Sequence, residues 1–295
     1  MRIREPWPVA RSKQRRREFD AVFAGVPPRG LGAALEIGAG DGFLASLLQD
    51  RCRSLVTTDL YRPRLAEGQT LSRRLLCDAT RLPFRDHAFD FIFSSSLLEH
   101  IRNRHDALAE MRRCLRPSGV MVHIMPSRVW KLLQLLFYYP HLLIGGVDLA
   151  LDAVMGRRRR RRLAGSTPAG PTLQKTSADR WSDARWRPSL RVVLRGILPT
   201  VHGEYSGHVA ELIGFGAARW VAEFRAAGFT VQGVVPLPLY SGYGFGLERL
   251  RRVGERAGLS AHNALVVTPA PDKGPAVDWF VRSPQPAFAS IAPVE

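Results

Sequence analysis

The sequence predicts an α/β fold in which a mostly parallel sheet is covered by helices on both faces. Short apolar runs that read as buried strands alternate, in the first half of the chain, with segments whose apolar residues recur at helical spacing. A turn with glycine at every second position, Gly38, Gly40 and Gly42, separates the first such strand from the first such helix. Ligands of such sheets bind beyond the carboxyl ends of the strands. We therefore expect a binding site at this turn.

The chemistry of the glycine turn favours a cationic ligand. Glycine reaches the backbone angles of a tight turn without strain, and its lack of a side chain lets a ligand approach the main chain. A dinucleotide fingerprint would need its third glycine at position 43, where the chain has Phe43. Two acids, Glu36 and Asp41, flank the turn, whereas a pyrophosphate would prefer neutral amides at a helix N-terminus.

Three further motifs follow the glycine turn in order. The strand-like segment 54–58 ends at Asp59, Cys77-Asp78-Ala79 precedes a Leu-Pro-Phe triplet, and the apolar segment 89–98 leads into Glu99-His100. With the glycine turn, this set resembles the class I S-adenosylmethionine-dependent methyltransferases, especially their type 11-like subgroup. S-adenosylmethionine carries a sulfonium and an ammonium group, which suits a turn flanked by acids.

The resemblance implies a Rossmann-like, seven-stranded, mostly parallel sheet, S-adenosylmethionine as the cofactor and methyl transfer as the reaction. In the family the acid at the position of Asp59 grips the ribose hydroxyls, and the acid at the position of Asp78 bonds the adenine amino group. Each such residue taken singly could be an ordinary turn or capping residue, so the resemblance rests on their order. The cofactor-binding residues that it implies are Glu36, Gly38, Ala39, Gly40, Asp59, Leu60, Asp78, Ala79 and Ser95.

Local patterns predict the elements around these motifs. Helices are expected over residues 10–24, 43–51, 62–67 and 105–115, and a strand over 120–125 after Pro117-Ser118-Gly119 stops the last of these helices. A later helix places Trp220 and Phe224 on one face and ends at Gly228. By the family resemblance, segments 229–235 and 264–268 supply the last two strands as an antiparallel edge.

A chain of 295 residues is long enough for one large domain with additions. The changes in composition predict a basic N-terminal segment with a lid helix (1–30), a cofactor-binding core (31–126), an α-helical, apolar and arginine-rich insertion before strand six (127–200), the C-terminal part of the methyltransferase domain (201–269) and a flexible tail (270–295). In the family, insertions at this point often shape the pocket for the methyl acceptor.

Charge and cysteine content indicate the surroundings of the protein. The formal net charge is +17, and six consecutive arginines occupy positions 157–162. The three cysteines are widely spaced, which indicates neither a disulfide framework nor a zinc site, and no metal site is predicted. The N-terminus has basic residues but no apolar signal-peptide core, so we expect a cytoplasmic protein.

The insertion predicts contact with an anionic membrane surface. Its segment 129–144 is apolar and aromatic but is interrupted by polar residues and a proline, so it is too broken to span a bilayer. The arginines that follow would meet anionic headgroups, each contributing about 1 kcal/mol. A solvated arginine loop and an RNA phosphate track are the alternatives, although no aromatics are interleaved with the arginines as in single-strand binders.

The sequence therefore predicts a methyltransferase that acts on a hydroxyl of a membrane-associated lipid or lipid-linked sugar, at the inner face of the membrane. A hydroxyl acceptor needs a base, for which we consider His202, His208 and His100, with Glu204 or Glu211 as the group that orients it. An RNA methyltransferase and a non-catalytic partner protein with the same fold are the alternative functions.

Overall fold

The structure is a computed structural model that describes residues 7–61, 73–144, 199–240, 245, 247–269 and 276–281. The chain divides into two compact units. The first comprises Met1–Gln134 and Val201–Glu295, and the second comprises Leu135–Thr200. All strands and numbered helices given below belong to the first unit.

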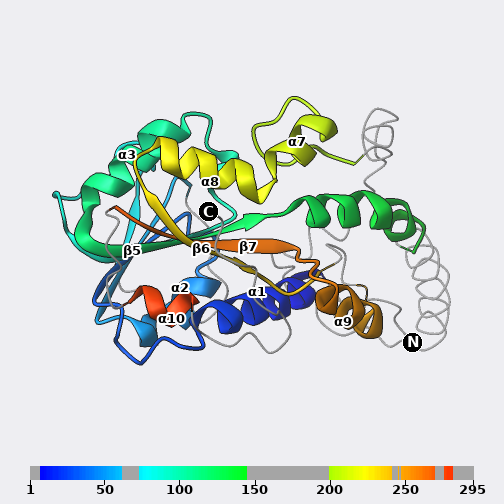
Figure 1. The fold of residues 1–295 in the computed structure, drawn as a ribbon, viewed down its shortest axis with the longest axis horizontal. Helices are drawn as coiled ribbons and strands as arrows, with labels where there is room; N and C mark the ends of the chain where they lie inside the picture. Colours follow the sequence, from blue (N-terminus) through cyan, green and yellow to red (C-terminus); the bar gives the residue numbers. More distant parts are fainter. Residues whose placement is uncertain are drawn as a thin grey trace, which may run out of the picture. The chain divides into compact units, whose positions relative to one another are not determined.

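A seven-stranded sheet forms the centre of the first unit (Figure 1). Its spatial order is β3-β2-β1-β4-β5-β7-β6. The strands from β3 to β5 in this order run parallel, whereas β7 is antiparallel to both of its neighbours, β5 and β6. This arrangement confirms the mostly parallel, Rossmann-like sheet with an antiparallel edge. The strands are β1 Ala33–Ile37, β2 Ser54–Asp59, β3 Arg74–Leu76, β4 Phe89–Ser95, β5 Leu115–Pro126, β6 Thr230–Pro236 and β7 His262–Thr268.

Helices cover both faces of this sheet (Figure 1). On one face lie α1 Trp7–Phe23, α2 Phe43–Leu48 and α10 Val277–Val281, and on the other lie α3 Arg104–Cys114 and α8 Ala217–Ala226. The remaining elements are the 3-10 turns η1 Gln49–Arg51 and η2 Leu98–His100 and the helices α7 His208–Gly214 and α9 Glu248–Arg256.

The alternation of side chains along each strand produces two hydrophobic clusters, one on each face. In β4, Phe91 and Phe93 pack into the cluster with α1, whereas Ile92 packs into the cluster with α3. In β5, Val122 packs into the cluster with α1, whereas Met121 packs into the cluster with α3. Because both faces are buried, these strands are apolar almost throughout, as is typical of parallel sheets.

The predicted N-terminal helix is present as α1 and packs through its predicted apolar face. Phe19, Val22 and Phe23 are all buried. Phe23 makes edge contacts with Phe93 at 5.4 Å and with Phe280 at 5.7 Å between ring centroids. Helix α1 is therefore part of the core of the first unit.

Two segments differ from the sequence prediction. The helix expected over 105–115 ends at Cys114, and β5 begins at Leu115, before the Pro-Ser-Gly segment, because Leu115 pairs with Phe89 ahead of a register shift. The region 270–295 was expected to be a flexible tail, yet residues 277–281 form α10. Phe280 of this helix is buried and stacks on Phe91 at 5.7 Å. Its burial explains the order of this segment.

The helix after β5 extends over residues 128–144 and crosses from the first unit into the second. Among the described parts of the chain, none of the helices has the length and apolar character needed to cross a bilayer. The expected helix at 62–67, residues 145–198 of the insertion and the arginine run lie outside the described residues.

Candidate functional site

The glycine turn lies at the carboxyl end of β1 and is held open by its backbone. Gly38, Gly40 and Gly42 have φ angles of 74°, 54° and 80°, in the left-handed region that other residues rarely adopt. A Cβ at Gly38 would lie 2.8 Å from the side chain of Leu97, whereas a Cβ at Gly40 would meet nothing within 4 Å. The space beside Gly40 can therefore admit a ligand to the main chain.

Asp59, the last residue of β2, connects the turn to the next strand. One of its carboxylate oxygens accepts a hydrogen bond from Gly40 N at 2.7 Å, and the other accepts one from Tyr61 N at 3.0 Å. A carboxylate oxygen has two acceptor positions, so Asp59 can also accept from sugar hydroxyls. Leu60 beside it is exposed. The structure thus places the predicted ribose-binding acid next to the glycine turn.

The third and fourth motifs reach the same edge of the sheet. Asp78 follows β3, is exposed, and accepts a hydrogen bond from Thr80 N at 2.9 Å, while Ala79 next to it is buried. Ser95 ends β4. The parallel registers place the ends of β1, β2, β3 and β4 side by side. The structure therefore brings all four sequence motifs together.

Glu36 is a buried carboxylate below this turn. It is 2% exposed, and its Oε2 atom has no hydrogen-bond partner among the described residues. Burial raises the pKa of Glu36 to about 8, although the nearby arginines Arg15 and Arg74 act in the opposite direction. A cationic ligand bound beside Glu36 would therefore form an ionic contact with this carboxylate and would favour its charged form.

Asp41 has a different role from the one expected. Its carboxylate lies 3.1 Å from Arg15 and 3.7 Å from Arg11, both on α1. From the sequence, Asp41 was expected to favour a cationic ligand together with Glu36, but in the structure Asp41 pairs with arginines of α1. It therefore connects this helix to the glycine turn.

Two of the predicted histidines lie together beyond β4. The turn η2 holds Glu99 and His100, and the loop before α7 brings His202 against them. The His100 and His202 rings are 4.5 Å apart between centroids, and His202 Nε2 is 3.8 Å from the Glu99 carboxylate. Burial lowers the pKa of His100, with Glu99 opposing this effect, so its neutral form is favoured.

The third predicted histidine, His208, belongs to another cluster. It lies at the start of α7, 3.8 Å from Glu211, which forms a fully buried ion pair of 2.6 Å with Lys131. Glu204, expected as an orienting group, instead pairs with exposed Arg102 at 3.3 Å. Of the three histidines, the structure thus brings only His100 and His202 into one cluster.

Comparison with known proteins agrees with this geometry. Residues 35–123, which contain all four motifs, match the family model for a methyltransferase domain. Residues 35–123 therefore form a methyltransferase domain, and the resemblance to the class I S-adenosylmethionine-dependent methyltransferases of the type 11 group is confirmed. Sequence relatives and solved structures can be compared with this domain.

Curated relatives are similar to part of this chain. The ubiquinone/menaquinone biosynthesis C-methyltransferase UbiE of Burkholderia mallei (strain SAVP1) is 38% identical over 126 residues, which are 39% of this chain and 51% of the relative. UbiE of Paraburkholderia phymatum is 39% identical over 69 residues, which are 23% of this chain and 28% of the relative. The chain thus spans about half the length of these relatives, or less.

A solved structure agrees with the fold of the methyltransferase. The complex of the Haloferax volcanii Trm112 methyltransferase activator with a candidate methyltransferase contains a chain that aligns with a TM-score of 0.50 and 13% identity. The alignment covers 89% of this chain and 94% of that one. At this identity the likeness applies to the fold alone.

The residues at the carboxyl edge of the methyltransferase sheet fit S-adenosylmethionine, the cofactor of this class. Asp59 retains acceptor capacity for the ribose, Gly40 leaves room beside the main chain, and Glu36 has an oxygen without a partner. When bound, the cofactor supplies an activated methyl group on a sulfonium. The residues of this chain would bind it, orient it and exclude water around it.

Two arginines of the candidate site were not predicted from the sequence. Arg74, in the short strand β3, donates to the carbonyl oxygen of Gly40 at 2.6 Å, and Arg15 reaches the turn from α1. No sequence motif marks either residue, because each is brought to the turn only by tertiary packing. These arginines partly offset the charge of the acids around the turn.

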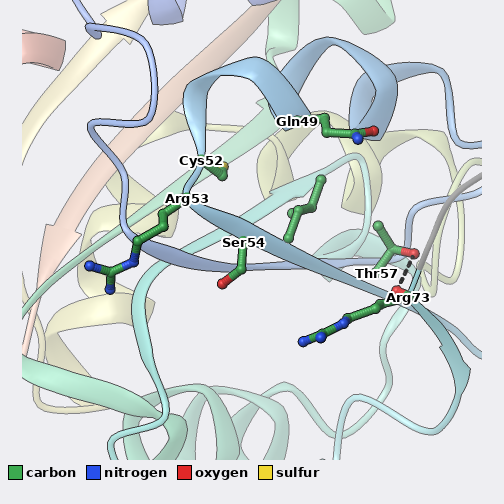
Figure 2. A pocket seen from close by; sticks show the side chains of 7 residues that line it. Gln49, Cys52, Arg53, Ser54, Thr57 and Arg73 are labelled. Carbon is green, nitrogen blue, oxygen red and sulfur yellow. Dashed lines mark hydrogen bonds between the residues drawn. The ribbon is translucent and has the colours of Figure 1, made fainter.

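A separate cavity lies beside the beginning of β2 (Figure 2). Its lining residues come from η1, from the two residues between η1 and β2, from β2 and from the residue before β3, and none belongs to the predicted cofactor site. They are Gln49, Cys52, Arg53, Ser54, Leu55, Thr57 and Arg73. Because β2 enters the sheet here and ends at Asp59, this cavity is distinct from the cofactor turn.

Proposed function

We propose that this protein transfers the methyl group of S-adenosylmethionine to a hydroxyl of a membrane-associated lipid or lipid-linked sugar. The observation that carries the transferase assignment is the convergence of the four motifs on one edge of the sheet, around a buried carboxylate with one oxygen that has no hydrogen-bond partner among the described residues. The acceptor proposal rests on the surroundings of the histidine pair and on the helix that follows β5.

The reaction would be an in-line displacement. The acceptor oxygen forms a bond to the methyl carbon as the carbon–sulfur bond breaks, and the sulfur keeps the electron pair as S-adenosylhomocysteine. Because the sulfonium is already an activated leaving group, alignment of the reactants contributes most of the catalysis. The hydroxyl proton must also leave, and a neutral imidazole of His100 or His202 could accept it.

The surroundings of His202 suit an acceptor with an apolar part. The indole of Trp130 lies 5.1 Å from the His202 ring, and the ring of Phe215 lies 6.4 Å from it, both measured between centroids. Aromatic side chains provide a large apolar contact area. Phe215 is fully buried, so the half-buried indole of Trp130 is the aromatic surface that an acceptor could contact. An aromatic surface beside a polar pair favours an amphipathic acceptor over a fully hydrated one.

The second unit contributes an exposed apolar stripe to the proposal. Leu136, Tyr139 and Leu143 are all exposed, and their spacing places them on one face of the helix. The arginine run at 157–162 follows in the sequence. Apolar contact combined with basic residues is typical of peripheral binding to anionic membranes. We propose that this segment holds the protein at the cytoplasmic face of a membrane.

A second candidate is methylation of a ring carbon of a quinone-like acceptor. The observation that favours it is the 38% identity, over 126 residues, to enzymes named as ubiquinone/menaquinone C-methyltransferases. That match covers 39% of this chain and 51% of the relative. The atom that is methylated therefore needs a direct test.

The cofactor is tested by calorimetric titration of S-adenosylmethionine into the wild-type protein and an Asp59→Ala variant. Loss of hydrogen bonds to a charged group costs about 1.5–3 kcal/mol, so binding should weaken by about 10- to 100-fold. Asp50→Ala removes an exposed acid outside the motifs and should leave binding unchanged. Equal binding by the wild type and Asp59→Ala would contradict the predicted ribose contact, and no binding by the wild type would refute the transferase proposal.

The acceptor is tested by incubating the protein with S-adenosylmethionine that carries a deuterated methyl group and a membrane lipid extract. Mass spectrometry then locates the labelled product. Hydriodic acid releases a methyl group from oxygen but not from a ring carbon, so release of the label supports the hydroxyl acceptor. Retention supports the quinone-like alternative, and a lipid extract without label would contradict both.

A further inference from the structure

The cluster of Glu99, His100 and His202 contains an unusual buried acid. Glu99 is fully buried, and neither oxygen of its carboxylate has a hydrogen-bond partner among the described residues. The Nε2 atom of His202 is 3.8 Å from this carboxylate, beyond hydrogen-bond distance. Buried polar groups are usually hydrogen-bonded, because leaving them without a partner is unfavourable. Within the described part of the chain, no hydrogen bond offsets the burial of the Glu99 carboxylate.

The two histidines provide further donor atoms around this acid. One donor atom from each of the three residues can be chosen so that all three lie within 4.8 Å of one another. Zinc binds histidine nitrogen and carboxylate oxygen at about 2.0–2.2 Å, which places neighbouring ligand atoms about 3–3.5 Å apart. Small side-chain rotations would close the remaining gap, and His100 is exposed enough to rotate.

The backbone holds this arrangement in place. Glu204 N donates a hydrogen bond to the carbonyl oxygen of Glu99 at 2.9 Å, which fixes the loop of His202 against η2. Gly203 between them has a φ angle of 73°, and a Cβ there would lie 2.5 Å from the same carbonyl oxygen. A glycine is thus required for the close approach that brings His202 to Glu99.

We propose that Glu99, His100 and His202 bind a divalent transition metal ion of the zinc type. Two imidazoles and one carboxylate favour such an ion over magnesium or calcium, which prefer oxygen ligands. Three protein ligands leave at least one coordination position open, as in catalytic rather than structural zinc sites. The sequence gives no hint of this site, because His202 is far from the Glu99-His100 pair in the chain.

The role of the ion rests on the proposed function. The cluster follows β4, whose end adjoins the glycine turn through the contact of Leu97 with Gly38. An acceptor hydroxyl bound to the ion would lose its proton more readily, because a Lewis acid stabilises the resulting oxygen anion. With both imidazoles bound to the ion, neither would serve as the base, and the hydroxyl proton would pass to solvent instead. The metal-bound oxygen would attack the methyl carbon, and the sulfur would leave as a neutral thioether.

The site is tested by titrating Co²⁺, whose visible absorption reports coordination, into untagged, chelator-treated full-length protein. We expect the absorption to saturate at one Co²⁺ ion per chain, and we expect Zn²⁺ to displace the bound Co²⁺ and abolish this absorption. Even outer-shell residues alter metal affinity by about 10- to 100-fold, so His100→Ala and His202→Ala should each weaken binding at least that much. His105→Ala removes an imidazole that is 80% exposed and should have no effect.

Two measurements keep the interpretation specific. Glu99→Gln preserves the size of the side chain while removing its charge, and it should also weaken Co²⁺ binding; thermal unfolding identifies any variant that is not folded. Calorimetry with S-adenosylmethionine on the same samples tests the cofactor site independently. Absence of Co²⁺ binding in the wild type, or equal binding by His202→Ala and His105→Ala, would overturn the metal site even if the cofactor binds. Metal binding without methyl transfer would leave the site standing and contradict its proposed role.

Discussion

Glu36 combines a buried position with a charge that the cofactor can use. In the folded chain its carboxyl group is removed from water, so the neutral acid is favoured and its pKa is raised to about 8. An ammonium or sulfonium group beside it would favour the ionised form instead. The protein thus keeps an acid below the glycine turn at the expense of stability near neutral pH.

Replacing Glu36 with glutamine should therefore stabilise the protein in a pH-dependent manner. The pKa of Glu36 is about 8 in the folded state, against an ordinary value of 4.5 for an exposed glutamate. Between these values the unfolded chain has released the proton that the folded chain retains, so the free energy of unfolding falls as pH rises. One group contributes at most about 1.4 kcal/mol per pH unit. The free energy of unfolding of Glu36→Gln should therefore exceed that of the wild type by an amount that grows from pH 5 to pH 8. Urea denaturation measures this difference.

If the difference in the free energy of unfolding between Glu36→Gln and the wild type is constant from pH 5 to pH 8, the raised pKa of Glu36 is contradicted. Asp50→Asn, an exposed acid in η1, serves as the control and should show no such trend.

At the level of single residues, sequence patterns located part of the site. Gly40, Asp59 and Asp78 were predictable because each lies at a fixed place after a strand. Arg74 and the contact of Glu99 with His202 were not, because these contacts depend on how distant segments pack. Local sequence contains no information about which side chains meet across the fold.

Among the structural elements, the ion pair of Lys131 with Glu211 connects the beginning of helix 128–144 to α7. Both side chains are fully buried and their charged atoms are 2.6 Å apart. Gln134 accepts a further hydrogen bond from Lys131 at 2.8 Å. Since α7 follows the loop of His202, this pair helps to position the histidine cluster.

Removing one partner of this pair should destabilise the fold strongly. Lys131→Met or Glu211→Leu leaves an uncompensated buried charge, which costs about 3–5 kcal/mol. The double variant removes both charges and should recover most of that loss. A double-mutant cycle by chemical denaturation measures the coupling. Additive effects of the two substitutions would show that the charges do not stabilise each other.

Most elements were predictable from periodicity, and the exceptions have physical causes. The alternation of strands and helices identified β1, β2, β4 and β5 with their connecting helices. Strand β3 has only three residues, too few for a pattern to emerge. Helix α10 has only five residues and lies among prolines and alanines, and it is ordered by the packing of Phe280 on the core.

At the scale of the whole molecule, the net charge of +17 predicts attraction to anionic surfaces. Net charge alone does not define which surface of the protein faces the membrane. The exposed apolar stripe of Leu136, Tyr139 and Leu143 provides a surface that can contact lipid. Burying a leucine side chain contributes about 1.5–3 kcal/mol. Charge and apolar area together would give stronger binding than either alone.

Flotation with liposomes tests this proposal. Wild-type protein should float with vesicles that contain anionic lipid and should remain behind with neutral ones. The variant Leu136→Ser/Tyr139→Ser/Leu143→Ser should lose most of its flotation. Leu250→Ser/Val253→Ser, which alters exposed apolar residues on α9, is the matched control and should float normally. Equal flotation of both variants would place the membrane contact elsewhere, and absence of wild-type flotation would refute it.

The sequence predicted the fold class and the cofactor half of the molecule better than the acceptor half. Residues 35–123 have repeated strand, turn and helix patterns at which ligands bind in a regular way. The proposed acceptor region draws on segments on either side of the insertion, such as those of Trp130 and His202, which meet only through tertiary packing. Composition therefore indicates its chemical character without defining its geometry.

The position of β7 has a consequence for biosynthesis. The strand that comes last in the sequence lies between β5 and β6, so β6 cannot join the sheet until β7 is in place. A ribosome releases the chain from its N-terminus at about 5–20 residues per second. The parallel half can assemble as it emerges, but β6 must wait for translation to pass Thr268. The unpaired edge of β5 is thus open to nascent-chain chaperones during that interval.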